Sequence, residues 1–263
     1  MLTIAQLTVS SAMTVDWGDT QTNSYSGAGA RTHTYAVAGT YTVRFLAPLL
    51  VTVLALSDAK VTLNSAQIKP VSNVGYFELT GIKAGTFNSA DVSNWRPNSF
   101  SMYIMPAGYA GTFNSADVSA WTPSTQFYVR AMPAGYAGTF NTADTIAWKV
   151  TTFRLDTMPT ATFTIIVSAG GFAAWTTTTM INMSANALTQ AQVDRILTDT
   201  YTAFATRTAT GGSITLSGAG NSAPSGIFQA QCPPVTGKEH AFELLNDSCL
   251  VNPTKKWSTV TTN

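Results

Sequence analysis

A block of twelve residues that occurs three times in the middle of the chain constrains the fold more than any other feature. The copies read AGTFNSADVSNW, AGTFNSADVSAW and AGTFNTADTIAW, at Ala84–Trp95, Ala110–Trp121 and Ala137–Trp148. Their first residues are 26 and 27 positions apart. Repetition at this period indicates stacked supersecondary units, because one such unit cannot bury its own apolar face.

Each block is followed by a short segment that begins with Phe and ends in Met-Pro. These segments are Phe100–Pro106, Phe127–Pro133 and Phe153–Pro159. The pattern predicts a recurring unit made of a strand, a Pro/Gly turn, a compact loop centred on a buried Phe, and a Trp that leads into the next strand. The central phenylalanines are Phe87, Phe113 and Phe140.

The strands between the blocks keep their apolar positions and change the residues in between. Because side chains alternate across a strand, the changing residues share the outer face. They are, in chain order, Ser101, Tyr103, Tyr128, Arg130, Arg154 and Asp156. Tyr and Arg are enriched at binding hot spots, which favours a binding face. A solvated face that varies freely is the alternative, and both interpretations stay open.

The composition argues against several classes of partner. Charged residues make up only 10% of the chain, the net charge is +1, and there is no basic run. Binding to a nucleic-acid backbone needs clustered Lys and Arg, so we expect no nucleic acid. The most apolar run, Phe45–Leu56, is too short to span a membrane, so we expect no membrane insertion. The N-terminus also lacks the basic start and long apolar core of a signal peptide.

The chemistry-bearing residues do not form a recognisable catalytic or cofactor site. Only two histidines occur, His33 and His240, and no phosphate-binding loop or HExxH motif is present. We therefore expect no enzyme, no cofactor and no metal. Cys232 and Cys249 lie 17 residues apart, and a free pair and a disulfide are both compatible with that spacing.

The segment 13–46 combines a tight turn with a strand pattern. The turn reads VDWGDT at Val15–Thr20, and the chain continues with HTYA at His33–Ala36 and GTYTV at Gly39–Val43. Asp beside Gly favours the turn, and Tyr and Val alternating with Thr predict a half-buried strand. The pattern resembles the PKD (polycystic kidney disease) domain, whose hallmark is a WGDG turn and an HxY…GxYxV strand.

This resemblance implies a small β-sandwich over residues 1–46 that acts as an extracellular spacer or adhesive module. Thr20 stands where the family has Gly. Asp16 and Asp19 could make the hydrogen bonds of the turn or bind Ca²⁺. A hard cation needs more oxygen ligands than this stretch offers, which favours the turn.

The array has a resemblance of its own. DVSNW at Asp91–Trp95, followed by an Asn/Ser turn and a strand, resembles the irregular leucine-rich repeats of BspA-like bacterial surface antigens. The resemblance implies a solenoid with parallel strands on one face over residues 47–185. In this chain Met-Pro replaces the family's usual Asn-Met, and Leu is scarce.

The sequence pattern of residues 186–263 predicts a mixed α/β cap that closes the stack. Thr189 and Gln192 form a capping box at the start of a helix. The predicted elements are a helix with its apolar face over Val193–Phe204, a strand at Ser213–Leu216, a helix at Lys238–Asn246 and a strand at Trp257–Thr262. The whole chain is thus expected to be mainly β, with a sandwich, a solenoid and a cap.

One unit departs from the repeat. The apolar, Gly-rich stretch Ile165–Phe172 lengthens the fourth unit and predicts a protruding loop or a contact with another subunit. We therefore expect a homo-oligomer.

The resemblances, the low charge and the missing signal peptide predict a non-enzymatic structural or adhesive protein of a bacteriophage virion, either a capsid decoration protein or a tail or fibre protein. It would lie on the virion surface and contact other virion proteins and a host surface glycan or protein. Two alternatives remain open: a bacterial surface adhesin, on the cell surface, and a glycan-degrading fibre enzyme.

Overall fold

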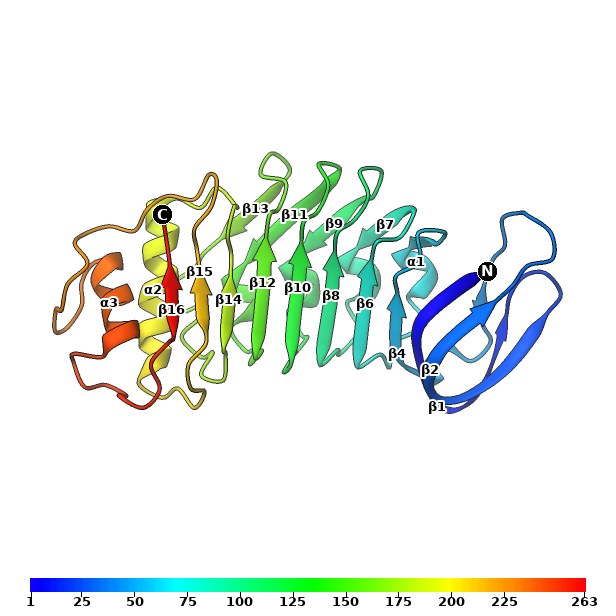
Figure 1. The fold of residues 1–263 in the computed structure, drawn as a ribbon, viewed down its shortest axis with the longest axis horizontal. Helices are drawn as coiled ribbons and strands as arrows, with labels where there is room; N and C mark the ends of the chain where they lie inside the picture. Colours follow the sequence, from blue (N-terminus) through cyan, green and yellow to red (C-terminus); the bar gives the residue numbers. More distant parts are fainter.

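The computed structural model describes residues 1–263 as an elongated, mainly β molecule, with an N-terminal hairpin at one end and two helices at the other (Figure 1). An eleven-stranded sheet runs along its length. Its strands are β1 (Leu2–Asp16), β2 (Thr22–His33), β3 (Arg44–Phe45), β4 (Val51–Leu56), β6 (Tyr76–Thr80), β8 (Ser99–Tyr103), β10 (Gln126–Arg130), β12 (Thr152–Asp156), β14 (Met180–Asn182), β15 (Ser213–Thr215) and β16 (Thr259–Thr261).

A second sheet of five strands lies behind the first (Figure 1). Its strands are β5 (Thr62–Asn64), β7 (Ala84–Asn88), β9 (Ala110–Asn114), β11 (Tyr136–Asn141) and β13 (Phe163–Ile166). Neighbouring strands of this sheet are parallel, and so are those of the large sheet from β4 to β16. Each repeat therefore contributes one strand to each sheet, and the predicted stack of parallel strands is confirmed.

The predicted compact loop around each central Phe is wrong. Phe87, Phe113 and Phe140 lie in strands β7, β9 and β11 of the second sheet. Short helices follow these strands and turn the chain back toward the large sheet. The short helical segments before and within the array are η1 (Pro48–Leu50), α1 (Ser65–Ile68), η2 (Ser89–Val92), η3 (Ser115–Val118) and η4 (Thr142–Thr145).

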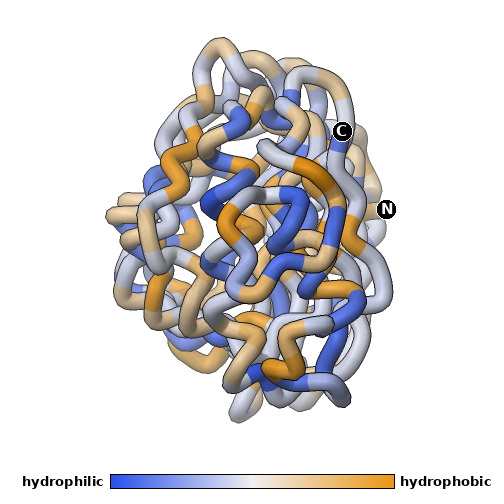
Figure 2. Tube along the Cα trace, turned by 90° about the vertical axis from the view of Figure 1, so that its left-hand side faces the viewer, coloured by the Kyte–Doolittle hydropathy of each residue, from blue (hydrophilic) through white to orange (hydrophobic).

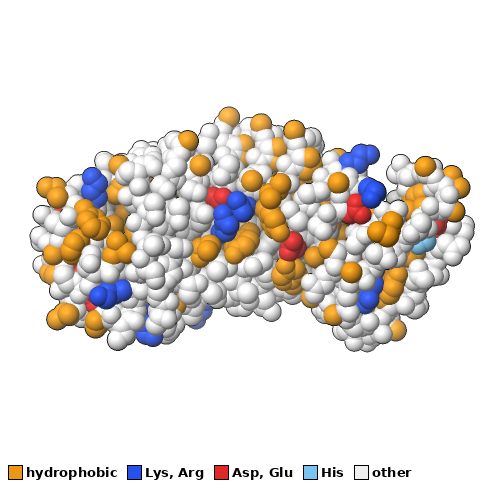
Figure 3. Space-filling view, in the orientation of Figure 1, with side chains coloured by type: hydrophobic (Ala, Val, Ile, Leu, Met, Phe, Trp, Pro, Cys, Tyr) orange, Lys and Arg blue, Asp and Glu red, His pale blue; other side chains and the backbone are white.

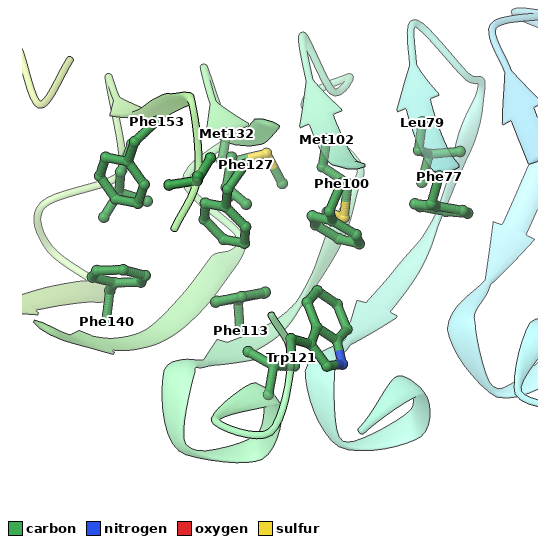
Figure 4. Close-up of a cluster of buried hydrophobic side chains, with 14 of the residues drawn as sticks. Phe77, Leu79, Phe100, Met102, Phe113, Trp121, Phe127, Met132, Phe140 and Phe153 are labelled. Atoms are coloured by element: carbon green, nitrogen blue, oxygen red, sulfur yellow. The ribbon is translucent and has the colours of Figure 1, made fainter. Parts of the chain in front are cut away.

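Aromatic side chains fill the space between the two sheets (Figure 4). On the large sheet, Phe100 stacks on Phe77 and Phe127 with ring centroids 5.5 and 5.8 Å apart. Phe113 of the second sheet packs against Phe127 at 5.7 Å, and Trp121, which follows η3, packs against Phe100 at 4.9 Å. All five are fully buried, so neighbouring units share one continuous core.

Polar side chains inside the repeated block join each unit to the next. The Ser89 hydroxyl accepts a hydrogen bond from the backbone N–H of Asn114 (2.8 Å) and donates one to the Asp117 carboxylate (2.5 Å). The same two bonds recur one unit earlier at Ser65 and one unit later at Ser115. The block recurs with little change because each of these residues has to meet the same partner in the following unit.

Residues 1–46 do not form the separate β-sandwich that the sequence predicted. β1 pairs antiparallel with β2 and β3 and also with β4, so these strands belong to the large sheet. The predicted strand around Tyr41 and Val43 pairs with β1 only at Arg44–Phe45. β1 also pairs with β4 at Gln6–Val9, so all strands of residues 1–46 belong to the one large sheet.

The apolar stretch of the fourth unit belongs largely to the core and is not a protruding loop, although Ile166 is exposed. Phe163–Ile166 forms β13 at the edge of the second sheet, and Ile165 is buried there. Phe172 is also fully buried and packs against Trp175 with ring centroids 4.6 Å apart. The longer unit thus extends the protein's own core.

The C-terminal region continues the large sheet with helices in place of second-sheet strands. α2 (Gln190–Phe204) connects β14 to β15, and α3 (Gly237–Asn246) connects β15 to β16. The predicted capping box of Thr189 and Gln192 is confirmed at the start of α2. Seen from this end, hydrophobic and hydrophilic segments are interleaved along the chain (Figure 2).

A buried arginine connects several backbone segments in the C-terminal region. Arg207 donates to the backbone carbonyl oxygens of Thr178, Gly211 and Lys255, and its guanidinium lies 3.9 Å above the Trp257 ring. Burial lowers the pKa of Arg207 to about 10, which still leaves it charged at neutral pH. The segments that precede β14, β15 and β16 are therefore linked to the turn that follows α2.

Candidate binding face

We define the outer face as the side chains of β6, β8, β10 and β12 that point away from the core. All six predicted site residues lie on it, in two rows set by the parallel register. Ser101, Tyr128 and Arg154 form one row, and Tyr103, Arg130 and Asp156 form the next. The space-filling view shows charged and hydrophobic side chains gathered over these strands, next to a mostly white stretch that separates them from the charged and hydrophobic side chains of the C-terminal end (Figure 3).

Two of the six residues are buried although they point outward. Ser101 is 1% exposed and Asp156 is 3% exposed. Larger neighbours on the same face cover them: Gln126 donates to the Ser101 hydroxyl at 2.7 Å, and two arginines enclose Asp156. Both side chains are therefore held by hydrogen bonds to their neighbours on the face.

Asp156 is the centre of a charged cluster. Arg130 donates from Nε to one carboxylate oxygen at 3.2 Å, and Arg154 donates from Nε to the other at 3.1 Å. The Arg154 guanidinium also lies 5.8 Å from the centroid of the Tyr128 ring. Arg130 uses only its Nε here, so its terminal amino groups remain available for a ligand.

Glu78 is the centre of a second cluster, which the sequence did not predict. Tyr76 and Tyr103 donate their hydroxyls to the two carboxylate oxygens, the latter at 2.9 Å, and no basic side chain pairs with Glu78. Burial, together with the hydrogen bond to Glu78, raises the pKa of both tyrosines above the ordinary value. Both hydroxyls therefore keep their protons well above neutral pH and continue to donate.

The two clusters border one pocket of about 330 Å³, lined by Tyr76, Glu78, Ser101, Tyr103, Gln126, Tyr128 and Arg130. Of the predicted residues, Arg154 and Asp156 lie outside this lining and support it through Arg130 and Tyr128. The residues that the sequence missed are Tyr76, Glu78 and Gln126. The same register would have found them, because Glu78 stands opposite Ser101, and Tyr76 and Gln126 both stand opposite Ser99.

A larger hollow of about 530 Å³ lies beside the turn after β3. Pro48, Leu49 and Pro70 are among its lining residues, and Lys69 is the one charged side chain there. It lacks the converging donors and acceptors of the outer-face pocket. It is therefore the weaker candidate for specific recognition.

The aspartates of the N-terminal turn make the hydrogen bonds that the sequence favoured. Asp16 accepts from the backbone N–H of Gly18 (2.8 Å), and Asp19 accepts from that of Gln21 (3.1 Å). The remaining oxygen of Asp19 lies 2.7 Å from Nε2 of His33. Although burial opposes the charged form, these bonds hold the pKa of Asp19 below its ordinary value.

The two cysteines form a disulfide, with Cα atoms 5.5 Å apart. Glu243 lies beside them, fully buried, and accepts hydrogen bonds from the Ser248 hydroxyl and the backbone N–H of Cys249. The sequence was compatible with a free pair and with a disulfide, and the structure contains the disulfide. Because the two sulfur atoms are joined to each other, this group of residues does not offer two thiolates to a metal ion.

Neither α2 nor α3, the two longest helices, combines the length and apolar character needed to cross a bilayer, and the shorter helices do not either. The comparison with known proteins gives no family assignment. No protein-family model, no curated protein and no solved structure matches this chain.

Proposed function

We propose that this protein is a non-enzymatic adhesive protein whose outer face binds a component of a host cell surface. The observation that carries the proposal is the pocket between the Glu78 and Asp156 clusters. Its polar groups converge from parallel strands whose inner side chains are fully buried, so the binding groups are held in place before a ligand arrives. Tyr and Arg, which predominate there, are enriched at binding hot spots.

The spacing of the two carboxylates supports binding over glycoside hydrolysis. Glu78 is on β6 and Asp156 on β12, with β8 and β10 between them. Three interstrand steps of about 4.8 Å place the two strands about 14 Å apart, and Asp156 lies two residues further along its strand than the position in register with Glu78. Glycosidases use carboxyl groups about 5–9.5 Å apart, and both Asp156 oxygens are already taken by arginines.

We further propose that the protein is displayed on a bacteriophage virion, as a capsid decoration protein or a tail or fibre protein. The support is the resemblance of the repeats to BspA-like leucine-rich repeats, which belong to surface-displayed modules. The sequence pattern of residues 13–46 also resembles the PKD domain, although these residues do not form its sandwich. The parallel stack is compatible with such a leucine-rich-repeat-like solenoid. Other virion proteins and further copies of the chain would then be its partners.

The adhesive role is tested with purified protein on intact bacterial cells. Tyr128→Ala and Arg130→Ala should each weaken binding by about 1–2 kcal/mol, as truncation of a central contact residue does. Arg96→Ala, an exposed position outside the pocket, serves as the matched control. Unchanged binding in both outer-face variants would contradict the proposal.

The location is tested separately by mass spectrometry of purified particles. Peptides of this chain should copurify with capsid or tail proteins through a density gradient. Their absence from particles, together with their presence on the bacterial envelope, would assign the chain to a bacterial surface adhesin.

A further inference from the structure

The pocket on the outer face has an unusual balance of charge. The charged side chains on the outer face are Glu78, Arg130, Arg154 and Asp156, two of each sign. The positive charges are engaged with Asp156, whereas Glu78 has only the two tyrosine hydroxyls. An anionic ligand would meet the Glu78 carboxylate, and a cationic ligand would meet the two arginines. The face therefore favours a ligand without net charge.

The free hydrogen-bonding capacity around the pocket is both donating and accepting. Each Glu78 oxygen already accepts one tyrosine hydroxyl and can accept another hydrogen bond, because an ionised carboxylate offers about four acceptor sites. The terminal amino groups of Arg130 are free donors, and the Gln126 amide donates only to Ser101. A ligand that satisfies these groups has to donate and accept at closely spaced positions, which is what neighbouring hydroxyl groups do.

The walls of the pocket add apolar surface. Tyr76, Tyr103 and Tyr128 line it and are half-buried, with their hydroxyls held by Glu78 or Thr152. The ring faces of tyrosine offer apolar contact beside a fixed polar group. The volume of about 330 Å³ lies at the small end of ligand pockets, which span about 300–1,000 Å³.

From these three observations we propose that the pocket bordered by Glu78, Tyr103, Gln126 and Arg130 binds a neutral saccharide unit, with sugar hydroxyls on Glu78 and Arg130 and a C–H face of the sugar ring against tyrosine. This assignment rests on the proposed adhesive function and specifies its ligand. Asp156 and Arg154 are positioning residues, because they hold Arg130 and Tyr128 and do not touch the ligand.

Isothermal titration calorimetry with soluble oligosaccharides tests the assignment. The neutral probes are maltose, cellobiose, lactose, mannobiose and chitobiose, and the acidic probes are sialyllactose and digalacturonate. We expect binding of at least one neutral probe and none of the acidic ones. Glu78→Gln and Arg130→Ala should each weaken that binding about tenfold or more, whereas Arg96→Ala should leave it unchanged. Denaturation midpoints of the variants show whether the fold is kept.

The outcomes separate this inference from the adhesive function. Binding of acidic probes only, or equal neutral binding in Glu78→Gln and Arg130→Ala, overturns the saccharide assignment. Absence of saccharide binding, combined with loss of cell adhesion in Tyr128→Ala, also overturns it but leaves the adhesive function standing. Absence of both saccharide binding and cell adhesion overturns both.

Discussion

The same strands of the large sheet supply the interior of the array and its outer face. The inward side chains repeat from strand to strand, whereas the outward side chains differ. One row of inward positions holds the same residue on four strands: Phe77, Phe100, Phe127 and Phe153. The outward row one position further along holds four different residues: Glu78, Ser101, Tyr128 and Arg154.

The difference follows from what each side chain contacts. An inner Phe packs against the same residue type in the units before and after it, so a change in one unit disturbs two interfaces. An outer residue has its own particular partner, as Tyr128 has Thr152 and Tyr103 has Glu78. The repeat thus reflects the packing of the stack, and the departures from it lie on the proposed binding face.

The largest loss of stability is expected at β10, where two adjacent residues point to opposite faces of the sheet. Phe127→Ala removes a fully buried ring that contacts both sheets and should lower the free energy of unfolding by about 3–5 kcal/mol. Tyr128→Ala, one residue further on and half-buried, should lower it by about 1 kcal/mol. Urea denaturation followed by circular dichroism gives both values. Equal losses would contradict the distinction between the two faces.

The second largest loss of stability is expected from substitution of a glycine inside a strand of the second sheet. Gly111 has φ +133°, and a Cβ there would lie 2.1 Å from the carbonyl oxygen of Phe87 in the neighbouring strand. Gly111→Ala should therefore cost about 2–4 kcal/mol through backbone strain and forced separation of the strands. Gly108→Ala is the matched control, because nothing lies within 4 Å of its Cβ. A stable Gly111→Ala protein would show that the two strands can separate without cost.

A third effect concerns the hydrogen bonds between units. Ser89→Ala removes a fully buried hydroxyl and leaves the backbone N–H of Asn114 and the half-buried carboxylate of Asp117 without their shared partner. The expected loss is about 1–3 kcal/mol, the usual cost of an unsatisfied buried group. Ser93→Ala in the same block changes an exposed hydroxyl and should have little effect. Thermal unfolding of the two variants side by side makes the comparison.

The large sheet could be predicted from the sequence because its strands carry a clear signal. Val51–Leu56 is a run of apolar and β-branched residues and forms β4. Phe127 and Val129 alternate with polar residues, which marks β10 and its buried side. The capping box at Thr189 likewise lies in a local pattern that needs no distant partner.

The second sheet could not be predicted in this way. Its strands read Ala-Gly-Thr-Phe-Asn, in which Gly and Ala disfavour a strand and only Phe is buried. They are extended because neighbouring units supply the hydrogen-bonding partners, which local propensity does not include. The pairing of β1 with β4 is equally non-local, since it joins residues more than forty positions apart.

Only part of the candidate site could be predicted, for a related reason. Comparing the repeats identified the outer positions from Ser101 to Asp156, because these change between otherwise similar units. Glu78 and Tyr76 lie on β6, which precedes the first copy of the repeated block, so the comparison of the strands that follow the three blocks did not include them. The burial of Asp156 depends on Arg130 one strand away, a contact that only the register reveals.

The smallest loss of stability is expected in the charged cluster around Asp156 on the outer face. Its measurement tests whether this cluster stabilises the fold. Arg154→Ala should cost less than about 1 kcal/mol, because the arginine is partly exposed and Asp156 keeps its bond to Arg130. Removing both arginines leaves a buried carboxylate uncompensated, so the double variant should lose more than the sum of the two single variants. Urea denaturation of the four proteins completes this double-mutant cycle. A loss above about 2 kcal/mol for Arg154→Ala alone would mean that a charged pair on the outer face stabilises the fold as much as the Ser89 hydrogen bonds do. The inner and outer faces would then differ in how their residues change between repeats but not in their contribution to stability.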